Sequence, residues 1–211
     1  MPDINQLLSD LHRLYPDAKY ELDFHSPFQL LIATVLAAQC TDERVNRVTA
    51  TLFQLYPDPT AFVAADPEEL EAALQPTGFF RQKARTVKAI CQALLERFGG
   101  QVPARMEDLL TLPGVARKTA NVVLTTALQI PSGIVVDTHV SRVSQRMGLV
   151  HGAEKAKASA EKIEEELMRK VPKAQWCFFG PALVLHGRYT CTARKPDCAG
   201  CALRERCEQN L

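Results

Sequence analysis

The amino-acid sequence predicts an all-α fold, and two observations support this prediction. Apolar residues recur at helical spacing in segment after segment, beginning with residues 4–14. Most of these segments start with residue types that cap helices or stop at a glycine. The one β-like run, residues 133–136, is short and lies between a Pro-Ser-Gly break and a helix cap, so we interpret it as an extended connector between two helical lobes.

Start and stop signals define the expected helices in order. Ser26, followed by a proline and by Gln29, has the residue types of a capping box. Asp42 and Asp66 are the caps expected for two further helices. The expected helices are 4–14, 28–38, 42–55, 66–74, 81–98, 106–110, 118–128, 137–146, 153–170 and 176–186.

A tight turn at Pro113-Gly114 joins two of these helices, and Lys118 lies in the first turn of the second one. Such a turn lets backbone N–H groups point outward at a helix start, which carries about half a positive charge. Both features suit a phosphate group, so residues 112–120 are a candidate for holding a nucleic-acid backbone beside an amine. For this segment alone, an ordinary helical hairpin with a solvated lysine is the alternative.

Composition and charge favour a globular protein with a polyanionic partner. The 211 residues are 46% apolar and 23% charged, which is typical of one domain or two small ones. Residues 1–80 carry 4 basic and 12 acidic side chains (net −8), whereas residues 81–211 carry 21 and 12 (net +9). A polyanion is attracted to surfaces built from the later segment, unless these charges are scattered over solvated helix faces.

The sequence contains no apolar run long enough to span a bilayer, and its first residues lack the pattern of a secretory signal. We therefore expect a cytoplasmic protein with no membrane partner.

Four of the seven cysteines fall within the last 21 residues, at Cys191, Cys198, Cys201 and Cys207. Without an export signal, disulfides are not expected, and the C-x6-C-x2-C-x5-C spacing indicates a metal centre. Zinc and an iron–sulfur cluster both accept four cysteines, and the spacing does not choose between them. Basic residues surround the array and can balance a dianionic cluster or meet phosphate.

The hairpin with its lysine, the run Val136-Asp137-Thr138-His139 and the cysteine array together resemble the endonuclease III family of the helix-hairpin-helix glycosylase superfamily. The resemblance covers nearly the whole chain. It implies a base-excision-repair DNA glycosylase with AP lyase activity that removes oxidised pyrimidines. It also implies a [4Fe–4S] cluster on the four cysteines. The expected partner is double-stranded DNA containing damaged bases or abasic sites, bound by a monomer associated with the nucleoid.

Two lobes follow from the resemblance. A six-helix domain with the helix-hairpin-helix motif is expected at residues 20–131. An iron–sulfur cluster domain is expected to join residues 1–19 to residues 132–211, with DNA gripped between the two lobes.

The resemblance also implies the catalytic residues. Lys118 matches the nucleophile, which attacks the sugar C1′, expels the base, forms a Schiff base and cleaves the strand 3′ to the abasic site by β-elimination. The attack needs the free amine, and we expect burial in the cleft between the lobes to help keep Lys118 unprotonated. Asp137 is expected to cap the helix that begins at Thr138 and to stabilise the cationic sugar. We expect its carboxylate to interact mainly with backbone N–H groups.

By the same resemblance, the DNA-contact residues are Gln39, Phe79, Gly114, Ala116, Arg194 and Lys195. Gln39 is expected to fill the space left by the flipped base. Phe79 is expected to wedge between bases, with core packing as the alternative. Ala116 replaces the second glycine usual in the hairpin, and Asp197 occupies a place where a basic residue is common.

Two other functions stay open at this point. An adenine-mismatch glycosylase of the same superfamily shares the cluster but lacks the lysine found here at position 118. A non-catalytic DNA-binding module built on iron–sulfur or zinc is the second alternative.

Overall fold

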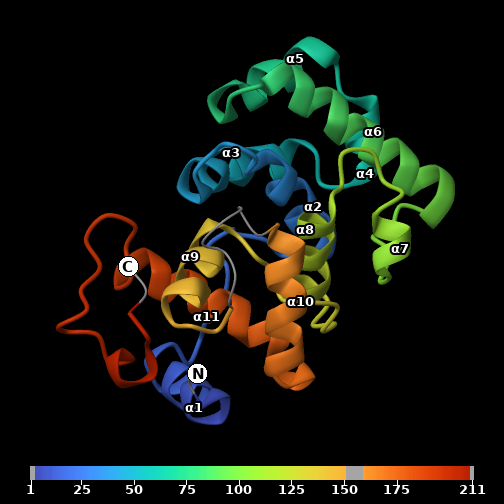
Figure 1. Ribbon diagram of the computed structural model, residues 1–211. Helices are drawn as coiled ribbons and strands as arrows, with labels where there is room; N and C mark the ends of the chain where they lie inside the picture. The colour runs from blue at the N-terminus through green and yellow to red at the C-terminus, as the bar shows by residue number, and fades with distance from the viewer. Residues whose placement is uncertain (1–2, 151–158, 210–211) are drawn as a thin grey trace. The chain divides into compact units, whose positions relative to one another are not determined.

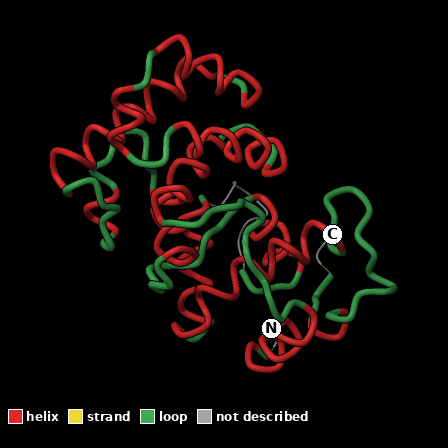
Figure 2. The backbone as a smooth tube through the Cα atoms, turned by 180° about the vertical axis from the view of Figure 1, so that it is seen from behind, coloured by secondary structure: helices red, strands yellow, loops and turns green. Residues whose placement is uncertain are grey.

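The computed structural model describes residues 3–150 and 159–209, which form helices and loops without a strand (Figure 1). Figure 2 shows the same residues as helix and loop alone, so the all-α prediction is confirmed. Contacts between Cα atoms divide the chain into two units. We call them the continuous unit (Glu21–Ile130) and the split unit (Met1–Tyr20 with Pro131–Leu211). No helix in the described ranges is long and apolar enough to cross a membrane.

The continuous unit is built around one apolar helix, α2. Seven of its ten residues are buried, and it packs against α3, α6 and α8. The short helices α4 and α5 pack against α6. The elements of this unit are α2 (Pro27–Leu36), α3 (Asp42–Leu55), α4 (Pro59–Ala64), α5 (Pro67–Leu74), η1 (Gln75–Thr77), α6 (Phe80–Phe98), α7 (Met106–Leu109), α8 (Arg117–Val122) and η2 (Val123–Ala127).

Polar side chains cap these helices much as the sequence predicts, with two corrections. Helix α4 was not expected, although Asp58 before a proline caps it by accepting from the Ala61 N–H at 2.9 Å. Thr41 rather than Asp42 caps α3, because the Thr41 hydroxyl accepts from the N–H three residues later. A side chain positioned one residue before the helix has the geometry to reach that group.

The helix expected at residues 118–128 is shorter than predicted. The α-helical part ends at Val122, and the chain continues to Ala127 as the wider π-helical turn η2. The Leu128 N–H donates to the Val123 carbonyl five residues back, at 3.3 Å. Thr125 Oγ1 also donates to the Asn121 carbonyl at 2.7 Å, a competing bond that bends or widens helices.

The split unit joins the beginning of the chain to its last third. Its elements are α1 (Ile4–Leu14), α9 (Thr138–Arg146), α10 (Ala160–Lys170), η3 (Lys173–Gln175), α11 (Trp176–Tyr189) and η4 (Arg204–Arg206). Apolar residues from α1, α9, α10 and α11 form one core with Ile134 and Leu203. Of the helix expected at 153–170, residues 153–158 lie outside the described residues, and α10 is capped by Ser159.

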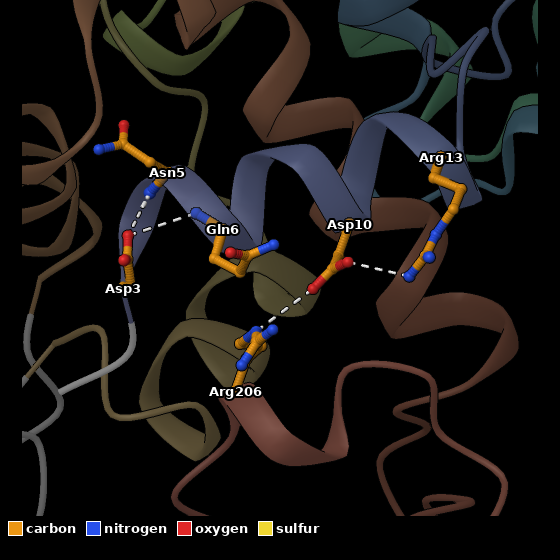
Figure 3. Close-up of polar contacts among 6 residues, drawn as sticks. All are labelled: Asp3, Asn5, Gln6, Asp10, Arg13 and Arg206. Carbon is orange, nitrogen blue, oxygen red and sulfur yellow. Dashed lines mark hydrogen bonds and ion pairs between the residues drawn. The ribbon is translucent and has the colours of Figure 1, made fainter.

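An ion pair of Asp10 connects the first helix to Arg206, near the end of the chain. Asp3 caps α1 by accepting from the N–H groups of Asn5 and Gln6 (Figure 3). Farther along α1, Asp10 contacts both Arg13, at 2.9 Å, and Arg206, at 3.3 Å (Figure 3). The chain therefore folds back so that α1 helps to hold the segment containing the last cysteine.

The β-like run at residues 133–136 forms no strand, as predicted. Residues 129–137 have neither helix nor strand structure, and Ile134, Val135 and Val136 are buried. The connector is thus an apolar segment that leads the chain directly to Asp137.

We expect Phe62→Ala to lower the free energy of unfolding by about 3–5 kcal/mol. Phe62 is fully buried, and its ring lies 5.8 Å from that of Phe28 and 5.2 Å from that of Tyr56. Urea denaturation followed by circular dichroism measures this. The control is Leu55→Ala, which removes a side chain from a residue that is 59% exposed and should change stability by less than about 0.5 kcal/mol. Equal losses in the two variants would contradict the assignment of this core.

Candidate active site and cluster site

The predicted hairpin joins α7 to α8 through a turn that requires glycine at position 114. Gly114 has a φ of 72°, and a Cβ there would lie 2.6 Å from Thr86 Cγ2. Ala116 instead has extended backbone, with φ −87° and ψ 167°, and is the N-cap of α8. Any residue adopts this conformation, so alanine in place of the usual second glycine introduces no backbone strain.

Lys118 is the second residue of α8, and its side chain is exposed to solvent. The alanine at the N-cap makes no side-chain hydrogen bond to the N–H groups of this helix start. Buried Leu112, Val115 and Ala120 fix the turn and the helix around the lysine. The continuous unit therefore holds the backbone of Lys118 in a buried apolar setting and leaves its amine exposed.

Asp137 caps α9, as predicted. Its Oδ1 accepts hydrogen bonds from the N–H groups of His139 and Val140, both at 2.8 Å. Two such bonds at a helix N-terminus hold the carboxylate in one orientation, and the helix dipole favours its negative charge.

Gln39 and Phe79 share an uncommon backbone conformation. Their φ angles are 54° and 47°, in the left-handed region that residues other than glycine rarely adopt. Phe79 is 66% exposed, which is contrary to the core-packing alternative for this residue. An exposed aromatic ring on a strained turn, directly before the long helix α6, has the placement of a contact residue.

The four C-terminal cysteines come together in the split unit. Cys191, Cys198, Cys201 and Cys207 line one cavity, together with the apolar side chains of Met147 and Leu203. Among the described residues, no three Cys, His, Asp or Glu side chains are grouped as the ligands of a single metal ion would be. The thiols thus surround a shared space, and sulfur is the donor that iron–sulfur clusters and structural zinc both take.

His186 also lines this cavity and is neutral at physiological pH. Burial lowers its pKa to about 4. Its Nδ1 lies 3.0 Å from the Tyr15 hydroxyl, and its Nε2 lies 3.8 Å from Cys201 Sγ. Burial, and to a lesser extent the neighbouring thiols, raises the pKa of both Cys201 and Cys207. Sequence reasoning missed His186, because nothing in the local pattern around it distinguishes a cavity residue from a core residue.

Two arginines of α9 hold the chain that enters the cysteine array. Arg142 donates to the carbonyl of Gly187 at 2.7 Å and to that of Cys191 at 3.1 Å. Arg146 donates to the carbonyls of Thr192 and Ala193 at 2.8 and 2.9 Å. Sequence reasoning missed both arginines, since each acts on residues more than forty positions away.

Close packing of α9 and α11 makes these contacts possible. A Cβ at Gly187 would lie 3.0 Å from the Cβ of His139 and 3.1 Å from Nη2 of Arg142, so a larger residue would fit only if these neighbours shifted slightly.

Arg194 and Lys195 are exposed on the loop between the first two cysteines, where phosphate can reach them. Thr192 Oγ1 donates to the Lys195 carbonyl at 2.7 Å and shapes this loop. Asp197 uses one carboxylate oxygen to accept from the Gly200 N–H at 3.0 Å. Asp197, an acidic residue where a basic one was expected, therefore stabilises the turn that leads to Cys201.

Arg146→Met should loosen the loop at residues 192–198 while leaving the fold intact. Losing two charged hydrogen bonds to backbone carbonyls, worth about 3 kcal/mol together, should make local opening about a hundredfold more frequent. Limited trypsin digestion, which cleaves after Arg194, measures this opening. The control is Arg169→Met, which removes an exposed arginine that pairs with Glu165 at 3.7 Å. Equal cleavage rates in both variants would show that Arg146 does not hold the loop.

Comparison with known proteins identifies the family. Residues 32–173 match the HhH-GPD superfamily base excision DNA repair protein family. Endonuclease III of Synechocystis sp. (strain ATCC 27184 / PCC 6803 / Kazusa) is 50% identical over 96% of this chain and 90% of its own length. Endonuclease III of Bacillus subtilis (strain 168) is 42% identical over 99% of this chain and 93% of its own length.

Solved structures agree with this result. A trapped endonuclease III–DNA covalent intermediate, an estranged-adenine complex, matches with a TM-score of 0.89 and 40% identity, covering 99% of this chain and 97% of that chain. A thermostable thymine-DNA glycosylase, at 21% identity and a TM-score of 0.82, shares the fold. The chain belongs to the endonuclease III family of the HhH-GPD superfamily of base excision DNA repair proteins.

Proposed function

We propose that this chain removes oxidised pyrimidines from double-stranded DNA and cleaves the abasic site that remains, with Lys118 as the nucleophile. Membership of the endonuclease III family makes it a DNA glycosylase and AP lyase. The residue assignment is supported by the position of Lys118, an exposed amine in the first turn of the helix that follows the Gly114 turn. A DNA substrate would place the protein in the cytoplasm, at the nucleoid.

The proposed reaction begins with the unprotonated amine of Lys118. Its Nζ forms a bond to the sugar C1′ while the glycosidic bond breaks, and the base leaves with the bonding electrons and takes up a proton. The amine nitrogen loses a proton, the C1′–O4′ bond opens and O4′ takes up a proton, which leaves an iminium ion at C1′. The iminium acidifies the C2′ protons. Removal of one of them expels the 3′ phosphate by β-elimination.

Asp137 would stabilise the positive charge that develops on the sugar as the base departs. Its hydrogen bonds to two backbone N–H groups support this role, because they orient the carboxylate before substrate binds. Such a fixed charge needs little reorganisation during the reaction.

The other proposed contacts hold the DNA. Gln39 and Phe79 would occupy the gap left when the damaged nucleotide leaves the stack. The backbone from Gly114 to Ala116, together with Arg194 and Lys195, would contact phosphates and so set the register of the protein on the duplex.

The cysteine array would hold a [4Fe–4S] cluster. The donor set fits, because four thiols line one cavity and each could bind one iron atom of a cubane. When bound, the cluster would order the loop that carries Arg194 and Lys195. The arginine contacts to the carbonyls at residues 191–193 hold the same loop from the side of α9.

Lys118→Ala should fold and bind DNA, yet form no covalent adduct when borohydride is added to an abasic-site duplex. The reason is that borohydride reduces and traps the Schiff base, which needs the lysine amine. The control is Lys162→Ala, which removes an exposed lysine from the first turn of α10 and should trap normally. Denaturing gel electrophoresis measures trapping.

Normal trapping by the Lys118→Ala variant would refute the nucleophile assignment. Excision of adenine opposite 8-oxoguanine without strand cleavage by the unmodified protein would indicate the adenine-mismatch activity instead. Binding without excision or cleavage would indicate a non-catalytic module.

Cys198→Ser should abolish the visible absorption of the purified protein. It should also abolish the binding of iron and sulfide. An iron–sulfur cluster absorbs visible light, whereas a Zn²⁺ site, with filled d orbitals, does not. The control is Cys91→Ala, since Cys91 is fully buried in α6 of the other unit. A colourless unmodified protein that binds zinc stoichiometrically would rule out the cluster.

A further inference from the structure

Helix α6 carries a buried lysine that the proposed chemistry does not use. Lys83 is 5% exposed and lies on the same face as the buried Ala84, Val87 and Ile90. Its Nζ donates to the carbonyl of Leu36 and to the carbonyl of Thr77, both at 2.8 Å. A side chain of one helix therefore holds two segments that are about forty residues apart in the sequence.

Each of these carbonyls lies at the edge of a turn that carries a proposed DNA contact. Leu36 is the last residue of α2, three positions before Gln39. Thr77 is the last residue of η1, two positions before Phe79. Both turns adopt the left-handed backbone described above, with φ of 54° and 47°. Non-glycine residues keep this conformation only where the surrounding structure enforces it.

Local hydrogen bonds shape each turn separately. The Cys40 N–H donates to the Ala37 carbonyl at 3.1 Å in the first turn. The Gly78 N–H donates to the Gln75 carbonyl at 3.2 Å in the second. These bonds fix each turn but do not fix one turn against the other. Lys83 does so, because a single nitrogen atom bonds to both.

Placing a cation at this buried position costs free energy. Burial penalises an ammonium group and lowers the pKa of Lys83. A methionine would fill the same space without that penalty, so packing alone does not explain a lysine here. Its distinctive property is an amine with several donors that can satisfy two carbonyls at once.

We propose that Lys83 is a positioning residue, which holds the Gln39 turn and the Phe79 turn in a fixed relation so that both side chains enter the DNA together. This inference rests on the proposed roles of Gln39 and Phe79 in filling the gap beside the flipped nucleotide. Lys83 itself contacts neither substrate nor DNA and acts through the two turns.

The test compares two substrates in the Lys83→Met variant. Excision of an oxidised pyrimidine from a duplex requires the nucleotide to be flipped and the gap to be filled. An abasic site has no base to unstack, so its cleavage depends less on gap filling. We expect excision to fall about tenfold or more, as for the loss of a charged hydrogen bond, and abasic-site cleavage to fall by less than about threefold.

Lys88→Met is the matched control. Lys88 is on the same helix, and its Nζ also donates to a backbone carbonyl, that of Ala65, at 2.6 Å. That carbonyl lies between α4 and α5, away from both turns, so the ratio of excision to cleavage should equal that of the unmodified protein.

In a Gln39→Ala background, Lys83→Met should reduce excision by less than about twofold further, since both changes impair the same step.

Hydrogen exchange gives a readout that does not depend on activity. Lys83→Met should speed exchange at the amides of both Cys40 and Gly78, whereas Lys88→Met should leave both unchanged. If Lys83→Met does not fold, Lys83→Gln, which keeps a neutral donor, is measured in the same way and should show the same changes.

An unchanged ratio of excision to cleavage, or unchanged exchange at both amides, would overturn the role of Lys83. Full additivity with Gln39→Ala would also overturn it. If the unmodified protein neither excises nor cleaves, the proposed function fails instead, and the exchange measurement still decides whether Lys83 holds the two turns.

Discussion

Cationic side chains bonded to the carbonyls at helix ends are the interaction on which both candidate sites depend. The last carbonyls of a helix have no partner within it, and they attract positive charge. Lys83 bonds to the carbonyl of Leu36, which ends α2, and Arg142 bonds to the carbonyl of Gly187 in the last turn of α11. The segments that follow these two helices carry Gln39 and the cysteine array. The cations therefore fix chemistry-bearing loops to rigid helices.

The N-termini of two helices, α9 and α8, differ in how their free N–H groups are satisfied. Asp137 satisfies two N–H groups at the start of α9 and so orients its own carboxylate. At the start of α8, Ala116 makes no side-chain cap, and the N–H groups there are near the exposed Lys118. A capped helix start thus presents a fixed negative charge, while an uncapped one suits an external anion such as a phosphate.

The sequence predicts the helices well where the signals are local. Ser26 caps α2, Asp66 caps α5 and Asp137 caps α9 as expected, because an N-cap bond joins residues two or three positions apart. Long-range contacts were not predictable in this way. Lys83 looks like an ordinary helical lysine until the fold brings the Leu36 carbonyl, 47 positions away, to its amine. The exposure of the Lys118 side chain could not be predicted either, because the sequence does not show which neighbours surround a side chain.

Lys118 is the residue that we propose forms the covalent bond to DNA. Its most direct test is to trap the unmodified protein on an abasic-site duplex with borohydride and to locate the adduct by peptide mass spectrometry. We expect the added sugar mass on the peptide that contains Lys118, attached to that lysine. An adduct on another lysine or on the terminal amine, with Lys118 unmodified, would contradict it.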